Sequence, residues 1–144
     1  MPANYIYSEQ SWGRIFYAWP GIGLDWNNAK SYCEADGAVL PIPRDAAQNN
    51  FVMEITNSYG NVWTGINDVE TEGSYVDNAG EPITWTNWWR TDCKRDFDDT
   101  DDCEPRDAVY IYGRHWGWMG ATKKWGHGET TESASVVCIK YLED

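Results

Sequence analysis

A short apolar stretch that runs directly into acidic residues is the feature that most constrains the fold of this chain. Residues 62–66 combine an aromatic residue, a glycine and β-branched residues, a pattern typical of a buried strand. Asp68, Glu70 and Glu72 follow at once. A strand that ends in clustered carboxylates predicts a hydrophobic core beneath it and a ligand-binding edge above it. The preceding sequence reads as scaffold, and most of the following sequence reads as loops.

Length and charge narrow the class of protein. The chain has 144 residues, about the size of one domain, so we expect residues 1–144 to form a single domain. The net charge of −12 argues against nucleic acid and anionic membrane surfaces as partners, because both attract basic proteins. No apolar run approaches the ~18 residues of a membrane span. The start, Met1-Pro2-Ala3-Asn4, has no signal-peptide pattern, and we interpret it as a mature form with an added initiator methionine.

Aromatic residues are unusually frequent, with ten Trp and nine Tyr. Such a surplus indicates either an aromatic core or a binding surface, because these side chains combine a large apolar area with one hydrogen-bonding group. We expect Trp26, Trp63, Trp85 and Trp125 to lie in the core. For Trp116 and Trp118 both interpretations stay open: packing over the edge of a sheet, or lining a site.

Four cysteines predict two disulfides. The chain has no Cys-x-x-Cys pair, and its two histidines are not near cysteines at zinc-site spacing. An even cysteine count in an acidic, aromatic-rich chain favours disulfides and a secreted, extracellular protein. Three connectivities are possible. We favour Cys33–Cys138, which would tie an early helix to the last strand, and Cys93–Cys103, which would close a short polar loop.

The order of elements predicts an α+β fold. Asp25 and Asp45 are suitable N-caps for helices over 26–36 and 46–58, and Gly37 is placed to end the first helix. In the second helix, a buried stripe is expected at Ala47, Phe51, Val52 and Ile55. Strands are expected over 5–19, 62–66, 83–85, 108–112 and 135–141, with a turn at 77–80 and a long polar loop over 87–106. Two helices followed by short strands and long loops are typical of the α+β class.

Several motifs, in order along the chain, resemble those of the C-type lectin-like domain family. They are Trp26-x-x-Ala29-x-x-x-Cys33-x-x-x-Gly37-Ala38-x-Leu40, Trp63-Thr64-Gly65-Ile66-Asn67-Asp68, Thr86-Asn87-Trp88 and Val136-Val137-Cys138. The resemblance extends from about residue 11 to 141. It implies the short form of that fold, two helices flanking short antiparallel sheets, as in soluble invertebrate-type lectins. It also supports the Cys33–Cys138 pairing.

The motifs that serve sugar binding in this family are altered. Sugar-binding members typically carry Glu-Pro-Asn or Gln-Pro-Asp in the long loop, then Glu-Asp-Cys and Trp-Asn-Asp, which together hold one calcium and the sugar. Here the corresponding stretches are Glu104-Pro105-Arg106, Arg106-Asp107-Ala108 and Trp125-Gly126-His127. Calcium takes about 6–8 oxygen ligands, whereas Arg106 is a cation, Gly126 has no side chain and an imidazole suits a hard ion poorly. The usual calcium-and-sugar site is therefore not expected to assemble.

An auxiliary calcium position is better preserved. Asp68, Glu72 and Asp107 match the positions that hold a second, structural calcium in the family that the chain resembles. The alternative is that these residues are solvated surface acids, as runs of charge usually are. Residues 96–102 also alternate oxygen donors like the start of an EF-hand loop, but the glycine and the late glutamate of that motif are missing.

These observations predict a carbohydrate-binding lectin with a non-standard site. The expected sugar-binding residues offer aromatic faces and polar groups: Glu104, Arg106, Tyr112, Trp116, Trp118 and His127. Acetamido sugars of the GlcNAc/GalNAc type would suit such a pocket, because the methyl group packs on a ring while the amide forms hydrogen bonds. Glycans or glycoproteins are the expected partners, and a dimer or larger homo-oligomer would provide avidity.

Two other classes of function are relevant to this sequence. The same fold without sugar activity could bind a protein, ice or a mineral surface. An enzyme is not expected, because there is no Gly-x-Ser-x-Gly motif or phosphate loop and the cysteines read as paired. Nothing in the sequence isolates a carboxylate in an apolar pocket, where its pKa would rise towards ~6–7.

Overall fold

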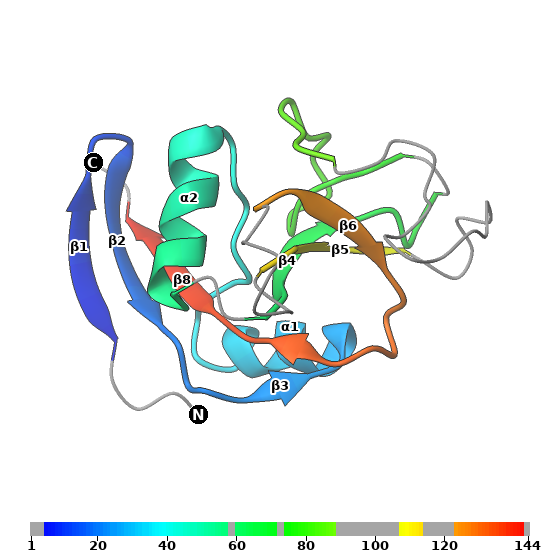
Figure 1. Cartoon of the computed structure of the whole chain (residues 1–144), viewed down its shortest axis with the longest axis horizontal. Helices are drawn as coiled ribbons and strands as arrows, with labels where there is room; N and C mark the ends of the chain where they lie inside the picture. Colours follow the sequence, from blue (N-terminus) through cyan, green and yellow to red (C-terminus); the bar gives the residue numbers. More distant parts are fainter. Residues whose placement is uncertain (1–4, 58–59, 72–73, 89–106, 114–122, 143–144) are drawn as a thin grey trace, which may run out of the picture.

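The computed structural model describes residues 5–57, 60–71, 74–88, 107–113 and 123–142, apart from the side chain of His127. These residues form two helices and eight strands, which confirms the α+β class (Figure 1). In chain order they are β1 Ile6–Gln10, β2 Gly13–Ala18, β3 Gly23–Leu24, α1 Trp26–Glu34, α2 Ala46–Ile55, β4 Val62–Asn67, β5 Ala108–Ile111, β6 Trp125–Gly128, β7 Ala134–Ser135 and β8 Cys138–Leu142.

The helices begin where the sequence predicts and end earlier. The side chain of Asp25 accepts a hydrogen bond from the N–H of Asn28, and that of Asp45 from the N–H of Gln48, so both predicted N-caps are confirmed. Gly37 has a φ of +75°, which suits a glycine just beyond a helix end. The helices nevertheless stop at Glu34 and Ile55. After Glu34 the N–H groups of Asp36 and Gly37 donate three residues back in a tight turn, and after Ile55 the backbone of Thr56 leaves the helical φ/ψ region.

The buried face of α2 differs from the predicted stripe. Asn49, Val52 and Met53 are its buried residues, whereas Ala47 is exposed. The predicted Phe51 and Ile55 are half-buried and pack against the core. The face of the helix is therefore turned relative to the prediction, and it carries a polar residue inward.

The strands form two sheets, in the orders β1-β2-β8 and β3-β7-β4-β5-β6. Neighbouring strands are antiparallel except β4 and β7. The strand expected over 5–19 is a hairpin that turns at residues 11–12, and the strand expected over 135–141 is divided into β7 and β8. The strand expected over 83–85 is not formed, whereas β6 was not predicted.

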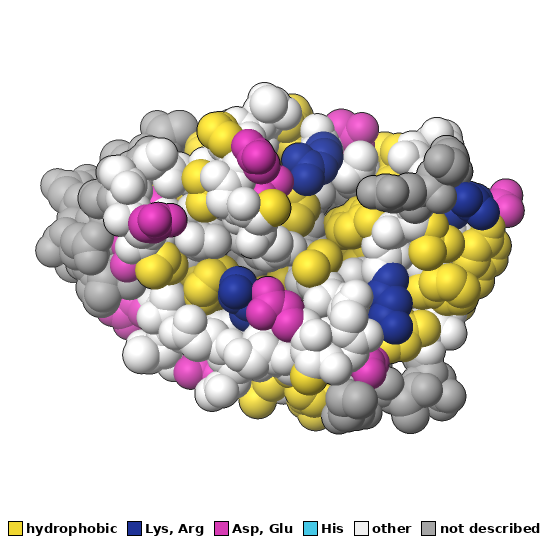
Figure 2. Space-filling model, turned by 180° about the vertical axis from the view of Figure 1, so that it is seen from behind, with side chains coloured by type: hydrophobic (Ala, Val, Ile, Leu, Met, Phe, Trp, Pro, Cys, Tyr) yellow, Lys and Arg dark blue, Asp and Glu magenta, His cyan; other side chains and the backbone are white. Residues whose placement is uncertain are grey.

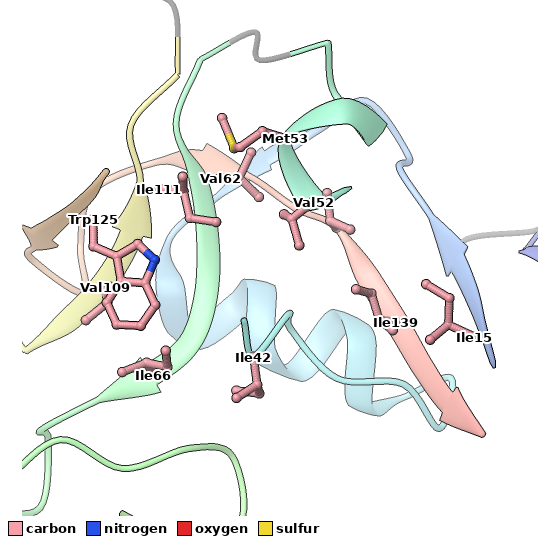
Figure 3. Close-up of a cluster of buried hydrophobic side chains, with 11 residues drawn as sticks. Ile15, Ile42, Val52, Met53, Val62, Ile66, Val109, Ile111, Trp125 and Ile139 are labelled. Carbon is pink, nitrogen blue, oxygen red and sulfur yellow. The ribbon is translucent and has the colours of Figure 1, made fainter. Parts of the chain in front are cut away.

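A first core cluster joins α2 to both sheets. In Figure 3, Val52 and Met53 from α2 point towards Val62 on β4, and Ile139 on β8 lies on the side of Val52. The other buried members are Ile15, Ile42, Ile66, Val109, Ile111, Trp125 and Val137. This cluster fixes the position of β4, and therefore of the acidic segment that follows it.

A second cluster lies beneath α1. Trp26, Ala29 and Cys33 of α1 pack with Trp63 of β4 and Tyr110 of β5. The indole N–H of Trp26 donates to the carbonyl of Thr64 at 2.9 Å, and that of Trp63 to the carbonyl of Leu24 at 2.8 Å. Each indole is thus buried with its polar atom hydrogen-bonded.

The disulfide Cys33–Cys138 is present and joins α1 to β8, as predicted. The predicted Cys93–Cys103 bridge lies outside the described residues. No helix in the described ranges is long and apolar enough to span a membrane.

Candidate ligand-binding site

The end of β4 and the start of β5 bring two of the predicted calcium ligands together. The backbone N–H of Asp68 donates to the carbonyl of Asp107 at 2.9 Å, so the two residues lie side by side. The side chain of Asp68 is buried and that of Asp107 is half-buried. In each, the carboxylate atom Oδ1 is shielded from solvent. Glu72, the third predicted ligand, lies outside the described residues.

The carboxylates of Asp68 and Asp107 supply part of the ligand shell that a hard cation needs. Carboxylate oxygens are the donors that calcium prefers, and about 6–8 oxygens complete its shell. Two carboxylates drawn away from water at one place are also stabilised by a cation between them. Among the described residues there is no group of three or more His, Cys, Asp or Glu side chains that could hold a metal. The described part of the site therefore supplies two acidic ligands, and a full shell needs Glu72, carbonyls or water.

The hairpin of β5 and β6 carries the positions at which the sugar motif is altered. Its register places Tyr110 opposite Gly126 and Val109 opposite His127. The ring of Tyr112 lies against Gly126 so closely that a Cβ there would be 2.5 Å from two ring carbons. Tyr112 also packs edge-on against Tyr110, with ring centroids 5.2 Å apart. A ligand-bearing side chain at position 126 is thus incompatible with the present position of Tyr112.

Along the sequence, the predicted sugar-binding residues Glu104 and Arg106 precede β5, and Tyr112, Trp116 and Trp118 follow it. Asp107 precedes the strand and Tyr112 follows it, five residues apart, which is about 17 Å in an extended strand. Arg106 adjoins the acidic pair in the sequence, whereas the segment with Trp116 and Trp118 continues from Tyr112. Glu104, Arg106, Trp116, Trp118 and the side chain of His127 lie outside the described residues, so their place in a site stays a prediction.

A set of hydrogen bonds, here called the polar anchor, holds the backbone where the 113–123 segment begins and ends. The sequence did not predict it. The N–H of Lys123 donates to the carbonyl of Tyr112, and the N–H of Tyr112 to the carbonyl of Lys124. The carbonyl of Lys123 accepts from the amides of Asn49, at 2.8 Å, and Asn87, at 2.9 Å. The two ends of the segment are therefore joined to each other, and the Lys123 end is also held by α2 and by Asn87. The one available signal was Asn87, within the Thr86-Asn87-Trp88 motif.

An aromatic wall stands beside this anchor. Trp85 and Trp88 both meet the buried Trp125 edge-on, with ring centroids 5.5 and 5.4 Å apart, and Tyr75 meets Trp88 at 5.0 Å. The indole of Trp125 donates to the amide oxygen of Asn49 at 2.7 Å. Trp125 is buried as predicted, while Trp85, predicted as core, is only half-buried.

Comparison with known proteins places this architecture in one family. The profile described as "Lectin C-type domain" matches residues 22–140. The chain is 39% identical over 69 residues to the C-type lectin domain family 3 member A homolog of Xenopus laevis, an alignment that covers 45% of this chain and 36% of that protein. The chain therefore spans well under half of that relative's length.

Solved structures agree in fold. The mouse scavenger receptor C-type lectin carbohydrate-recognition domain superimposes with a TM-score of 0.72 at 17% identity, covering 96% of this chain and 95% of that one. A Ca²⁺-dependent type II antifreeze protein in its Ca²⁺-free form gives 0.70 at 21% identity, covering 97% and 99%. At these identities the likeness concerns the fold alone. Because the family profile matches most of the sequence, and the two helices, two sheets and Cys33–Cys138 disulfide agree with it, the chain belongs to the C-type lectin domain family.

Proposed function

We propose that this protein is a secreted, carbohydrate-binding lectin whose site does not use the family's usual calcium-and-sugar residues. The observation that carries the proposal is the Tyr112 ring seated on Gly126. A ring at this place takes the room of a calcium-ligating side chain, and it offers an aromatic face with a hydroxyl instead. The proposed role is binding, with no catalytic step.

The chemistry of the site suggests its ligands. Sugars present apolar C–H faces, which pack on aromatic rings, and hydroxyls, which pair with polar side chains. Tyr112 supplies both kinds of group, and Trp116, Trp118, Glu104, Arg106 and His127 are the proposed further contacts. An acetamido sugar of the GlcNAc or GalNAc type would place its methyl group on a ring. Glycans or glycoproteins are the proposed partners, with avidity from a homo-oligomer.

A structural calcium is the second part of the proposal. Asp68 and Asp107 lie side by side, and Glu72 would complete the acidic set. When bound, calcium would neutralise these carboxylates and hold the end of β4 against the start of β5. It would support the loops around the sugar without touching the sugar itself.

A glycan array in calcium and in EDTA tests the lectin function. Binding is expected to persist in EDTA, or to weaken only modestly, because no proposed sugar contact passes through the metal. Tyr112→Phe keeps the ring and removes the hydroxyl, so it should weaken binding by about five- to tenfold, the effect of one lost hydrogen bond. Ser31→Ala removes an exposed hydroxyl on α1 and serves as the control.

Two outcomes would count against the lectin proposal. Binding abolished by EDTA would mean that the metal lies in the sugar site. An array that stays blank with and without calcium would end the lectin interpretation and leave binding to a protein, ice or mineral surface as the function to test.

Calorimetric titration with calcium tests the metal site separately. Binding is expected at millimolar calcium or below, and Asp68→Asn should weaken it at least about tenfold because a charged ligand is lost. Glu70→Gln removes an exposed carboxylate two residues away and should leave the affinity unchanged. A flat titration of the unaltered protein would exclude this site without bearing on the sugar.

A further inference from the structure

Strand β1 is the open edge of its sheet. The strand order β1-β2-β8 leaves β1 with one neighbour. The far edge of β8 is met by Val39, which pairs with Ile139, and the far edge of β6 by residues 87–88, which pair with Trp125. Within the described residues, β1 is thus the only sheet-edge strand longer than two residues that lacks a pairing on its outer side.

The sequence of β1 carries few of the features that protect an edge strand. Exposed edge strands of monomeric proteins usually carry lysine, proline or a bulge that prevents pairing with another chain. Here the strand reads Ile-Tyr-Ser-Glu-Gln, with Glu9 as its single charge. Ile6 is 55% exposed and Tyr7 45% exposed. A regular five-residue edge with two exposed apolar side chains and a single charge is a template for another strand.

The sheet face beside this edge is apolar too. Tyr17 packs on Phe51 of α2, so alternation along β2 turns Phe16 to the opposite face of the sheet. Register places Tyr7 beside Phe16 on that face, and their rings meet edge-on at 5.3 Å. Figure 2, which views the molecule from behind, shows hydrophobic side chains gathered with Lys and Arg on the side that carries β1 and β2.

Charge also distinguishes this surface. The chain as a whole carries −12, yet among the described residues of these strands the exposed face presents Arg14 and Lys140 with Glu9 as its acid. These two cations therefore offset part of the repulsion that two acidic copies would meet at these strands. Antiparallel pairing about Ser8 would place Tyr7 opposite Glu9 of the second copy, so no like charges would face each other.

We propose that β1 pairs antiparallel with β1 of a second copy about a two-fold axis at Ser8, joining two three-stranded sheets into one of six strands. This register pairs all five residues of β1. The Tyr7 rings of the two copies would then lie diagonally across the axis, each packed on Phe16 of its own chain and opposite Glu9 of the other. The proposal is independent of the sugar site, because strand pairing needs neither calcium nor glycan.

The salt dependence of association distinguishes this dimer from the binding of an acidic partner. Two copies of charge −12 repel each other at long range, and salt screens that repulsion over about 10 Å at 0.1 M. A dimer held by backbone pairing and apolar contact should therefore become tighter as salt rises. An acidic partner attracted to Arg14 and Lys140 would instead bind more weakly.

Sedimentation velocity of the whole chain, at up to about 1 mM and at low and high salt, measures this equilibrium. A monomer–dimer equilibrium that tightens with salt is expected. Tyr7→Glu sets a carboxylate against Glu9 twice in each dimer and should raise the dissociation constant about tenfold. Val69→Glu adds the same charge at a residue 52% exposed elsewhere and should change it less than about twofold. Combining Tyr7→Glu with Glu9→Lys should restore association.

A second variant tests the register without relying on that equilibrium. Ser8→Cys should form a disulfide-linked dimer on oxidation, because opposite residues in antiparallel strands have Cα atoms about 4.5–5.5 Å apart, within disulfide range. Ser31→Cys, exposed on α1, should stay unlinked. A chain that remains monomeric, a dimer insensitive to Tyr7→Glu, association weakened by salt, or equal cross-linking at both cysteines would overturn the proposal.

Discussion

Asp77 shows, at the scale of one residue, how a carboxylate fixes the turn after β4. Its Oδ1 accepts from the N–H of Ala79 at 2.8 Å and of Glu81 at 3.1 Å, and its Oδ2 pairs with the Arg44 guanidinium at 3.2 Å. Burial acts to raise the pKa of this carboxyl, but these hydrogen bonds and the guanidinium outweigh it, so the pKa lies below its ordinary value of 3.8.

The lowered pKa predicts a pH dependence with a definite sign. Below about pH 4 the unfolded chain takes up a proton at Asp77 before the folded chain does, so the free energy of unfolding falls as pH falls through that window. At neutral pH the contribution is fully present. Asp77→Asn should therefore reduce stability by about 1–2 kcal/mol at pH 7 and by less at pH 3. Urea unfolding at several pH values measures this difference.

Glu81→Gln is the control for that experiment, since it removes an exposed carboxylate from the same turn. A stability loss in Asp77→Asn that is equal at both pH values would contradict the assigned cause. The sequence predicted a turn over 77–80, because Asp, Asn and Gly are turn residues. It did not predict Arg44 as a partner, since a contact across 33 positions depends on how the chain folds back.

Two glycines show that some positions are explained by local backbone conformation and others by a residue distant in the sequence. Gly37 closes the turn after α1 for a local reason, its positive φ, and a glycine near this helix end was predicted to do so. Gly126 was recognised only as a missing ligand. Its structural cause is the ring of Tyr112, which occupies the space that a side chain would need. A sequence shows that a side chain is absent, but not which neighbour fills the gap.

At the scale of elements, Asn49 is the residue that joins α2 to β6. It is 2% exposed, donates to the carbonyl of Lys123 and accepts from the indole of Trp125. Asn49→Ala would leave the buried indole N–H of Trp125 without its acceptor, and the carbonyl of Lys123 with Asn87 alone as donor. Such a loss should lower the free energy of unfolding by about 3 kcal/mol, measured by urea titration with tryptophan fluorescence as the signal.

Asn50→Ala is the matched control, since the neighbouring amide is exposed on the same helix and should cost less than about 0.5 kcal/mol. Equal losses in the two variants would show that the link to β6 contributes nothing. The sequence located α2 by its cap but not the face it buries, because Asn49 interrupts the apolar pattern. It also missed β6, whose Trp-Gly-His-Gly sequence has weak strand propensity and depends on pairing with β5.

Topology at the scale of the whole molecule depends on the closing strand, which brings residues near both ends of the sequence together. β8 pairs with β2, and Cys138 is bonded to Cys33 across 105 positions. The paired cysteines, the helix and the last strand were all predictable, because each has a motif in the sequence. The order of strands in the two sheets was not, since β3, β6 and β7 are too short to be recognised without their neighbours.

The long loop closed by Cys33–Cys138 makes its removal costly. Replacing both cysteines by alanine frees a loop of more than one hundred residues in the unfolded chain, and the chain-entropy estimate for such a loop is about 5 kcal/mol. The predicted bridge between Cys93 and Cys103 would close a loop of only about ten residues, worth about 3 kcal/mol by the same reasoning. Urea unfolding of the two double-alanine variants compares them directly. A larger loss from Cys33→Ala/Cys138→Ala is expected, and no loss at all from Cys93→Ala/Cys103→Ala would mean that the second bridge does not form.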